Sequence, residues 1–240
     1  MHKPLVIITG ATSGIGLAAA HLFHKEGYPL LLLGRSIEKL TALGLENTLV
    51  RQVDVVDIGS LKRAVGEAEA KFGPADCLLN VAGVMLLGDL SEQDATQWQT
   101  MLNVNVLGVM NGMHSVLSGM KERQHGTIMN VSSIAGIKPF PNHAAYTATK
   151  FAVHGLSDNV REEVALYNVR VMTIAPGAVE TPLLSHTTSQ QIKEDYQQWK
   201  QEIGGVLEAK TVAEAMLFAY QQPQSVCLRE IVLSATKQAA

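Results

Sequence analysis

Apolar and polar residues follow two alternating patterns along this chain. Short runs rich in Val, Ile and Leu predict strands, and they occupy residues 5–9, 30–33, 48–53, 76–81, 127–131, 169–175 and 230–233. Between them, apolar residues recur with helical spacing over residues 15–25, 37–43, 61–72, 95–121, 145–166 and 212–221. Thr211 and Glu214 have the spacing of a capping box at the start of the last helix.

The order of these elements predicts the fold class. Several strands are apolar without alternation, which is typical of parallel strands covered on both faces. Strands that alternate with helices form a doubly wound sheet, and right-handed crossovers restrict its topology. We therefore expect an α/β protein with a single Rossmann-type parallel sheet of about seven strands and helices on both faces. No repeat or linker divides residues 1–240, so one domain is expected.

One segment, at about residues 183–205, departs from the alternation. It is rich in Gln, Ser and Thr, contains Trp199 and ends in Gly204 and Gly205. Because it follows the sixth strand, it lies at the sheet edge where sites form in this architecture. We expect a substrate lid with the two glycines as its hinge, and a pair of surface helices is the alternative.

A glycine-rich turn follows the first predicted strand and opens a helix. Glycine tolerates a positive φ and lets a diphosphate approach the backbone, and the helix N-terminus offers N–H groups to phosphate oxygens. The turn therefore predicts a dinucleotide site. The expected contacts are Gly10, Thr12, Ser13, Gly14, Ile15 and Gly16.

The end of the second strand carries information on the coenzyme. An NAD enzyme has an acidic residue about 20 residues past the glycines, which binds the ribose 2′-hydroxyl. Gly34, Arg35 and Ser36 stand there instead. A guanidinium can hold a 2′-phosphate, and a serine hydroxyl can add a hydrogen bond. The missing acid favours NADP(H) over NAD(H); the alternative is a solvated Arg35 beside a helix-capping Ser36.

Polar and small residues also follow the third and fourth strands. Asp54, with Val55 beside it, could accept a hydrogen bond from an adenine amino group or cap the next helix. Asn80, Ala82 and Gly83 would let the chain pass beneath a ribose, with Asn80 holding nearby backbone. A structural turn is an equally good interpretation of Asn80.

A tyrosine and a lysine lie four residues apart at the start of a predicted helix, at Tyr146 and Lys150. This spacing places them on one helix face. A fixed ammonium lowers the pKa of a neighbouring phenol, and such a pair suits proton transfer at a carbonyl or alcohol oxygen. Ser133 ends the fifth strand region, and Asn105 interrupts an otherwise apolar helix, where an unbonded amide costs about 1–3 kcal/mol.

These pieces together resemble the classical short-chain dehydrogenases/reductases. The resemblance runs from Leu5 to the final strand and covers residues 9–16, 80–83, 130–133 and 176–181, with Asn105, Tyr146 and Lys150, in the family's order and spacing. Val81 is a departure, because the family usually has Asn there. Gly34 and Arg35 are similar to the NADP-preferring subset. The ending at residues 231–238 is similar to bacterial NADP-dependent members that act on small hydroxy acids and related alcohols.

The resemblance implies a role for each matched residue. Tyr146 would be the general acid in reduction and the base in oxidation, and Lys150 would lower its pKa and bind the nicotinamide ribose. Ser133 would hydrogen-bond the substrate oxygen, and Asn105 would hold a water that connects Lys150 to solvent. The nicotinamide carboxamide would be held after the sixth strand. The residues expected there are Pro176, Gly177, Val179 and Thr181.

Composition narrows the function classes further. A net charge of -3 gives no basic field for nucleic acid, and no apolar run is long enough to span a bilayer. Cys77 and Cys227 fit two thiols in a reducing compartment, so a cytoplasmic location is expected. No His, Cys, Asp or Glu cluster has metal-ligand spacing. The resemblance implies a homotetramer or homodimer formed through the helices at 95–121 and 145–166.

The sequence thus predicts an oxidoreductase that transfers a hydride between NADP(H) and a small carbonyl or alcohol. The alternatives are an NAD-dependent alcohol or steroid-type dehydrogenase and a non-catalytic nucleotide-binding regulator of the same fold. The substrate is a small molecule that residues 135–143 and the lid would contact. Neither segment contains an Arg to clamp a carboxylate, which argues against the hydroxy acids.

Overall fold

The apolar runs form one parallel sheet in the computed structural model, which describes residues 3–238. Its strand order is β3-β2-β1-β4-β5-β6-β9, and every neighbouring pair is parallel. The strands are β1 (Leu5–Thr9), β2 (Leu30–Gly34), β3 (Thr48–Gln52), β4 (Ala75–Asn80), β5 (Gly126–Val131), β6 (Val169–Pro176) and β9 (Glu230–Leu233). The fold class expected from the sequence is confirmed.

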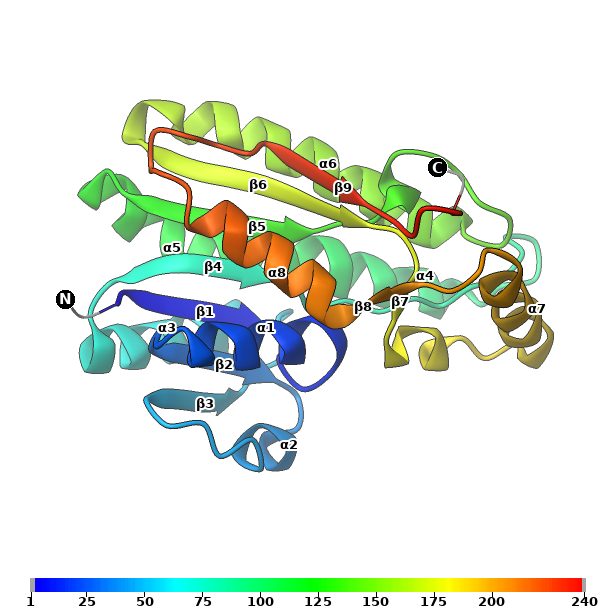
Figure 1. The fold of residues 1–240 in the computed structure, drawn as a ribbon, viewed down its shortest axis with the longest axis horizontal. Coiled ribbons are helices and arrows are strands. Elements are labelled where there is room, and N and C mark those ends of the chain that lie inside the picture. Colours follow the sequence, from blue (N-terminus) through cyan, green and yellow to red (C-terminus); the bar gives the residue numbers. More distant parts are fainter. Residues whose placement is uncertain (1–2, 239–240) are drawn as a thin grey trace.

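Helices cover both faces of the sheet (Figure 1). One face is packed by α1 (Gly14–Lys25), α2 (Ile37–Thr41) and α8 (Ala209–Tyr220), and the other by α3 (Ile58–Phe72), α5 (Gly108–Arg123) and α6 (Ala144–Val164). Successive strand residues point to opposite faces, so Leu5 and Ile7 join one core while Val6 and Ile8 join the other. A strand buried on both sides needs this unbroken apolar sequence.

The helix expected over 95–121 is divided. It consists of α4 (Ala95–Leu102), one wide π-helical turn at Asn103–Leu107, and then α5. The extra residue in that turn directs Asn105 inward, where its Oδ1 accepts a hydrogen bond from Val84 N at 2.8 Å. Its Nδ2 donates to Val84 O at 2.9 Å. Single π-helical turns of this kind often mark functional sites.

The predicted capping box at Thr211 is wrong. Helix α8 begins at Ala209, with Glu208 before it, so Thr211 lies inside the first turn. The start is fixed by a short strand, β8 (Leu207–Glu208), which pairs with β7 (Val179–Glu180) and leads directly into the helix.

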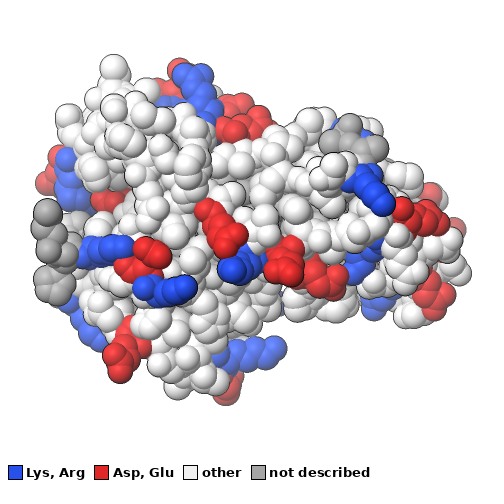
Figure 2. Space-filling view, in the orientation of Figure 1, with Lys and Arg blue, Asp and Glu red and all other residues white. Residues whose placement is uncertain are grey.

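The segment at 183–205 contains a 3₁₀ turn (Pro182–His186) and α7 (Gln190–Glu202). It lies at the end of the molecule toward which the strands point their carboxyl ends (Figure 1). Gly204 and Gly205 follow α7 with φ of 74° and 110°, values that glycine adopts readily. On the face shown in Figure 2, positive and negative side chains are interspersed, and no extended patch of one sign forms.

Candidate active site

The site lies at the carboxyl ends of the strands, where the strand order reverses between β1 and β4. Thr9 Oγ1, at the end of β1, accepts hydrogen bonds from Val81 N at 3.0 Å and Ala82 N at 3.1 Å. These bonds connect the end of β1 to the loop after β4. Gly10 has a φ of 69°, and a Cβ there would lie 2.8 Å from Ala82 N. Above these loops is a cavity of about 830 Å³. Ligands bind at this switch point in open α/β sheets.

The glycine turn forms one end of the cavity. Gly10, Thr12, Ser13, Gly14 and Ile15 line it. Gly16 lies directly behind, where a Cβ would overlap the Gly10 carbonyl oxygen. The turn therefore leaves its backbone open to a ligand at the N-terminus of α1, and this shape fits the diphosphate of a dinucleotide.

The end of β2 forms the next part of the wall. A Cβ at Gly34 would lie 2.9 Å from Thr12 Cγ2, so a carboxylate side chain there would displace Thr12. Arg35 and Lys39 both line the cavity, and the Arg35 guanidinium makes no ion pair within residues 3–238. Ser36 Oγ accepts a hydrogen bond from Lys39 N at 3.4 Å, so Ser36 caps α2 and also lines the cavity.

Asp54 and Val55 line the cavity after β3. Asp54 Oδ1 accepts a hydrogen bond from Val56 N at 3.0 Å and does not cap α3. Asp57 caps that helix, since its Oδ1 accepts from Gly59 N at 2.9 Å. The capping interpretation of Asp54 is therefore wrong.

The residues after β4 separate into two groups. Ala82 and Gly83 line the cavity. Asn80 lies behind it with only 2% of its surface exposed, and its Nδ2 donates to Asn130 Oδ1 at 2.9 Å and also contacts Val109 O. The structure therefore places Asn80 as a link between β4 and β5, away from the cavity surface.

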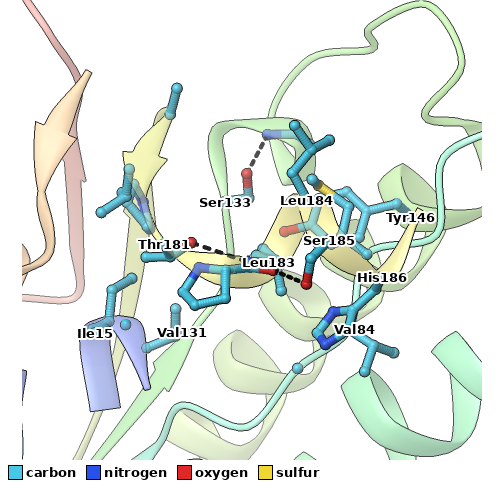
Figure 3. A pocket seen from close by; sticks show the side chains of 18 of the residues that line it. Ile15, Val84, Val131, Ser133, Tyr146, Thr181, Leu183, Leu184, Ser185 and His186 are labelled. Atoms are coloured by element: carbon cyan, nitrogen blue, oxygen red, sulfur yellow. Dashed lines mark hydrogen bonds between the residues drawn. The ribbon is translucent and has the colours of Figure 1, made fainter. Parts of the chain in front are cut away.

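Ser133, Tyr146 and Lys150 all line the same cavity. Figure 3 shows Ser133 and Tyr146 on this part of the wall. Ser133 follows β5, and Tyr146 and Lys150 lie in the first turns of α6, one above the other. Tyr146 and Lys150 are each 6% exposed, and Lys150 Nζ lies 5.5 Å from the Tyr146 ring centroid. The ammonium is held in place by a hydrogen bond to Val131 O at 3.0 Å. The spacing of four therefore places both side chains on the cavity wall.

Burial sets the charge states of this pair. Burial and the neighbouring Tyr196 phenol raise the pKa of Tyr146 above its ordinary value, and a hydrogen bond with Ser133 opposes the rise only in part. This is the reverse of the lowering expected from Lys150. Burial lowers the pKa of Lys150 to about 8. Tyr146 is therefore a neutral phenol at neutral pH, suited to donate a proton.

Asn105 lies behind the same wall. Besides its two bonds to Val84, its Nδ2 donates to Thr149 Oγ1 at 3.1 Å. A Cβ at Gly83 would lie 3.3 Å from Asn105 Oδ1 and 3.9 Å from Lys150 Nζ. The amide thus fixes the loop after β4 beside the lysine.

A series of hydrogen bonds connects α6 to the end of β5 and to β9. Ser132 Oγ donates to Lys150 O at 3.0 Å and lies 2.9 Å from His154 Nδ1. His154 Nε2 lies 3.0 Å from Glu230 Oε1, which connects the helix to β9. No local sequence pattern predicts these hydrogen bonds, because the residues that make them come from three distant segments.

The loop after β6 closes the remaining side. Pro176, Gly177, Val179 and Thr181 line the cavity. Thr181 Cγ2 would lie 2.9 Å from a Cβ at Gly14, so this loop packs against the glycine turn. Figure 3 shows Thr181 near Ile15 on one side and Leu184 beside Ser133 and Tyr146 on the other.

Sequence reasoning missed most of the apolar wall around Tyr146. Met85, Phe140 and Tyr196 all pack in one cluster with that tyrosine. A signal existed on α7, where Ile192, Tyr196 and Trp199 recur with the spacing of one helix face in an otherwise polar segment. All three line the cavity.

Comparison with known proteins decides the family. A family model described as short chain dehydrogenase matches residues 4–192. The chain belongs to the short-chain dehydrogenase family. An uncharacterized oxidoreductase of Staphylococcus saprophyticus is 30% identical over 240 residues, covering 98% of this chain and 96% of that protein. The membership confirms the resemblance drawn from the motifs, and this short-chain dehydrogenase is an oxidoreductase by family.

Solved structures agree with this placement. The closed form of a serine dehydrogenase complexed with NADP+ is 29% identical, has a TM-score of 0.90, and covers 98% of this chain and 96% of its own. ElxO with NADP bound is 28% identical, with a TM-score of 0.85 and 96% coverage of both chains. Within residues 3–238 of this short-chain dehydrogenase, no helix is long and apolar enough to cross a membrane, and no three His, Cys, Asp or Glu side chains form a metal-binding group.

Proposed function

We propose that this protein transfers a hydride between NADP(H) and a small carbonyl or alcohol, with Tyr146 as the general acid and base. One observation carries the proposal: a cavity that begins at the glycine turn ends at Ser133, Tyr146 and Lys150. A nucleotide-binding regulator would not need a buried phenol and ammonium beside a serine hydroxyl in the same cavity. NAD-dependent alcohol or steroid-type oxidation is the second candidate.

The residues present fit a dinucleotide. The glycine turn would hold the diphosphate, Asp54 the adenine side, Ala82 and Gly83 a ribose, and the loop after β6 the nicotinamide. When bound, the nicotinamide supplies or accepts the hydride. Arg35 and Lys39 support NADP(H), since two cations line the corner where an NAD enzyme has an acid. Two similar solved structures carry NADP in their names.

The protein's own residues then handle the proton. In reduction, Tyr146 donates its phenolic proton to the substrate oxygen while the Ser133 hydroxyl hydrogen-bonds the same oxygen. Lys150 would hold the nicotinamide ribose hydroxyls and stabilise the phenolate left behind. Lys150 would then pass a proton to that phenolate, and a water held by Asn105 would return a proton from solvent to Lys150.

Residues 183–205 act as the lid of this site. Thr187 Oγ1 accepts a hydrogen bond from Leu87 N at 3.1 Å, and Lys200 Nζ lies 2.8 Å from Glu180 Oε2. These contacts and the β7–β8 pair hold the segment over the cavity. Opening would break them while Gly204 and Gly205 rotate. The chain is otherwise one domain.

NADPH-dependent reduction of a panel of aldehydes and ketones tests the function, and its pH profile tests the site. The Lys150 ammonium is present below its pKa of about 8 and lost above it. We expect kcat/KM for NADPH, which reports the free enzyme, to fall about tenfold per pH unit above pH 8. In Lys150→Arg, which keeps its charge, the fall should move to higher pH. A wild-type profile that stays flat to pH 10 would argue against this role of Lys150.

We also propose that the protein forms a homodimer or homotetramer in the cytoplasm. Leu102, Leu107, Met110 and Phe151 are large apolar side chains exposed on the π-helical turn and the flanking helices α4, α5 and α6. Such a patch on a single copy favours association. Light scattering should give at least twice the 25.8 kDa monomer mass, and Met110→Lys with Phe151→Lys should lower it. A monomeric mass for the wild-type protein would refute the assembly.

A further inference from the structure

The substrate half of the cavity has an apolar wall. Its members come from the loops after β4 and β5, from the 3₁₀ turn and from α7, and they surround Tyr146. They are Met85, Leu87, Phe140, Leu183, Leu184 and Ile192. Tyr196 and Trp199 extend this wall, with ring centroids 5.3 Å apart. A substrate carbonyl placed at Tyr146 would therefore have the rest of its molecule in apolar surroundings.

The cations on the cavity wall either lie at the nucleotide end or already have a hydrogen-bond or ion-pair partner. Among the described residues these are Arg35, Lys39, Lys150 and Lys200. Arg35 and Lys39 lie at the nucleotide corner after β2, and Lys150 donates to Val131 O. Lys200 is the one cation on the lid side, and it pairs with Glu180 at 2.8 Å.

The other ionisable groups at this end add no positive charge. Asp195 lines the cavity from α7 and Glu180 lines it from β7, so this side of the cavity has two carboxylates and one ammonium, that of Lys200. Burial lowers the pKa of His143. Burial and, to a smaller extent, the positive charge of Arg35 lower the pKa of His186. Both imidazoles are therefore neutral at neutral pH. A substrate carboxylate that entered this half of the cavity would lose its hydration and find no unpaired cation there.

We infer that the substrate is an uncharged carbonyl compound with an apolar body, and that the lid excludes carboxylates. The inference rests on the proposed function, because it takes Tyr146 as the point where the carbonyl binds. The family does not settle the charge of the substrate, since the names of similar proteins include a serine dehydrogenase and a levodione reductase. The charged residues on this protein's own cavity wall are therefore the basis for inferring an uncharged substrate.

A matched substrate pair tests the inference. Ethyl 4-oxopentanoate and 4-oxopentanoate carry nearly the same ketone and differ in charge at the far end. We expect kcat/KM to be about 100-fold higher for the ester, because the acid buries an unpaired charge. Ligand-observed NMR with NADP+ present should show binding of the ester and not of the acid at equal concentration.

A charge variant beside the lid sharpens the test. Glu180→Gln, on β7, removes the partner of Lys200 and leaves the Lys200 ammonium to face the cavity. We expect the ester-to-acid ratio of kcat/KM to fall about tenfold, because the freed ammonium can pair with the carboxylate of the acid. Glu202→Gln is the control with the same change of charge, since Glu202 is exposed on α7, the helix of Lys200, and does not line the cavity. Its ratio should match the wild type.

The two readouts separate this inference from the proposed function. If no carbonyl compound of the panel is reduced but NMR still shows the preference for the ester, the proposed function fails, and only the exclusion of carboxylates from the cavity is upheld. Binding or turnover of the acid equal to that of the ester overturns the inference, and so does binding of neither compound.

Discussion

Replacing Tyr146 by Phe should lower turnover by about 1,000-fold, within the range that general acid catalysis contributes. The substitution removes one oxygen and keeps the ring, which packs among Met85, Ala135 and Leu184. The cavity shape and the glycine turn stay as they are, so the Kd for NADPH, followed by fluorescence titration, should change less than about threefold. Loss of rate with intact binding would assign the phenol to the chemical step.

Tyr167→Phe provides the control for this variant. Tyr167 is an exposed residue just after α6, with its ring beside Lys121, and it does not line the cavity. It should leave both rate and NADPH binding unchanged. A Tyr146→Phe enzyme as fast as the wild type would exclude Tyr146 as the proton donor, whatever the binding data show.

Replacing Arg35 by Glu should reverse the preference between the two coenzymes. The change removes a charge-assisted hydrogen bond worth about 1.5–3 kcal/mol and puts a carboxylate where a 2′-phosphate would lie. KM for NADPH should rise by about 100-fold or more. KM for NADH, which has a hydroxyl at that position, should stay the same or fall. Initial rates with both coenzymes at a fixed substrate concentration measure the effect.

Arg63→Glu makes the same change of charge on the exposed face of α3, outside the cavity. It should leave the ratio of the two KM values at the wild-type figure. If Arg35→Glu also left that ratio unchanged, or if the wild-type protein used NADH as well as NADPH, the interpretation of Arg35 would be wrong.

The sheet could be predicted from the sequence because its signal is local. Strands β1 and β2 each begin with four consecutive apolar residues, a pattern that only a strand buried on both faces requires. The glycine turn and the Tyr146–Lys150 pair could be predicted for a similar reason. Backbone conformation at Gly10 and helix periodicity at Tyr146 each depend on a few adjacent residues.

Other features depend on contacts between distant segments. The π-helical turn exists because Asn105 reaches Val84, which lies 21 residues away. The start of α8 is fixed by pairing between β7 and β8, and the Thr211 capping box has no part in it. Spacing alone predicted that Lys150 would lower the pKa of Tyr146. The burial that raises this pKa comes from the lid and from the loops after β4 and β5, which no local pattern encodes.

The geometry connects these features to one chemical role. The reversal between β1 and β4 opens the cavity, the glycine turn gives it a phosphate-binding end, and α6 gives it a proton donor. The lid brings Tyr196 against that donor and supplies the apolar wall. The proposed hydride transfer to a small carbonyl would use all of these parts, whereas nucleotide binding alone would need neither the proton donor nor the apolar wall.

Transfer of label from the coenzyme tests this role most directly. The wild-type protein is incubated with NADPH deuterated at both C4 positions and with the best ketone of the panel, and the alcohol is analysed by mass spectrometry and NMR. We predict one deuterium on the carbinol carbon of the alcohol and none elsewhere. Formation of unlabelled alcohol, or no oxidation of NADPH with any carbonyl compound, would contradict the account.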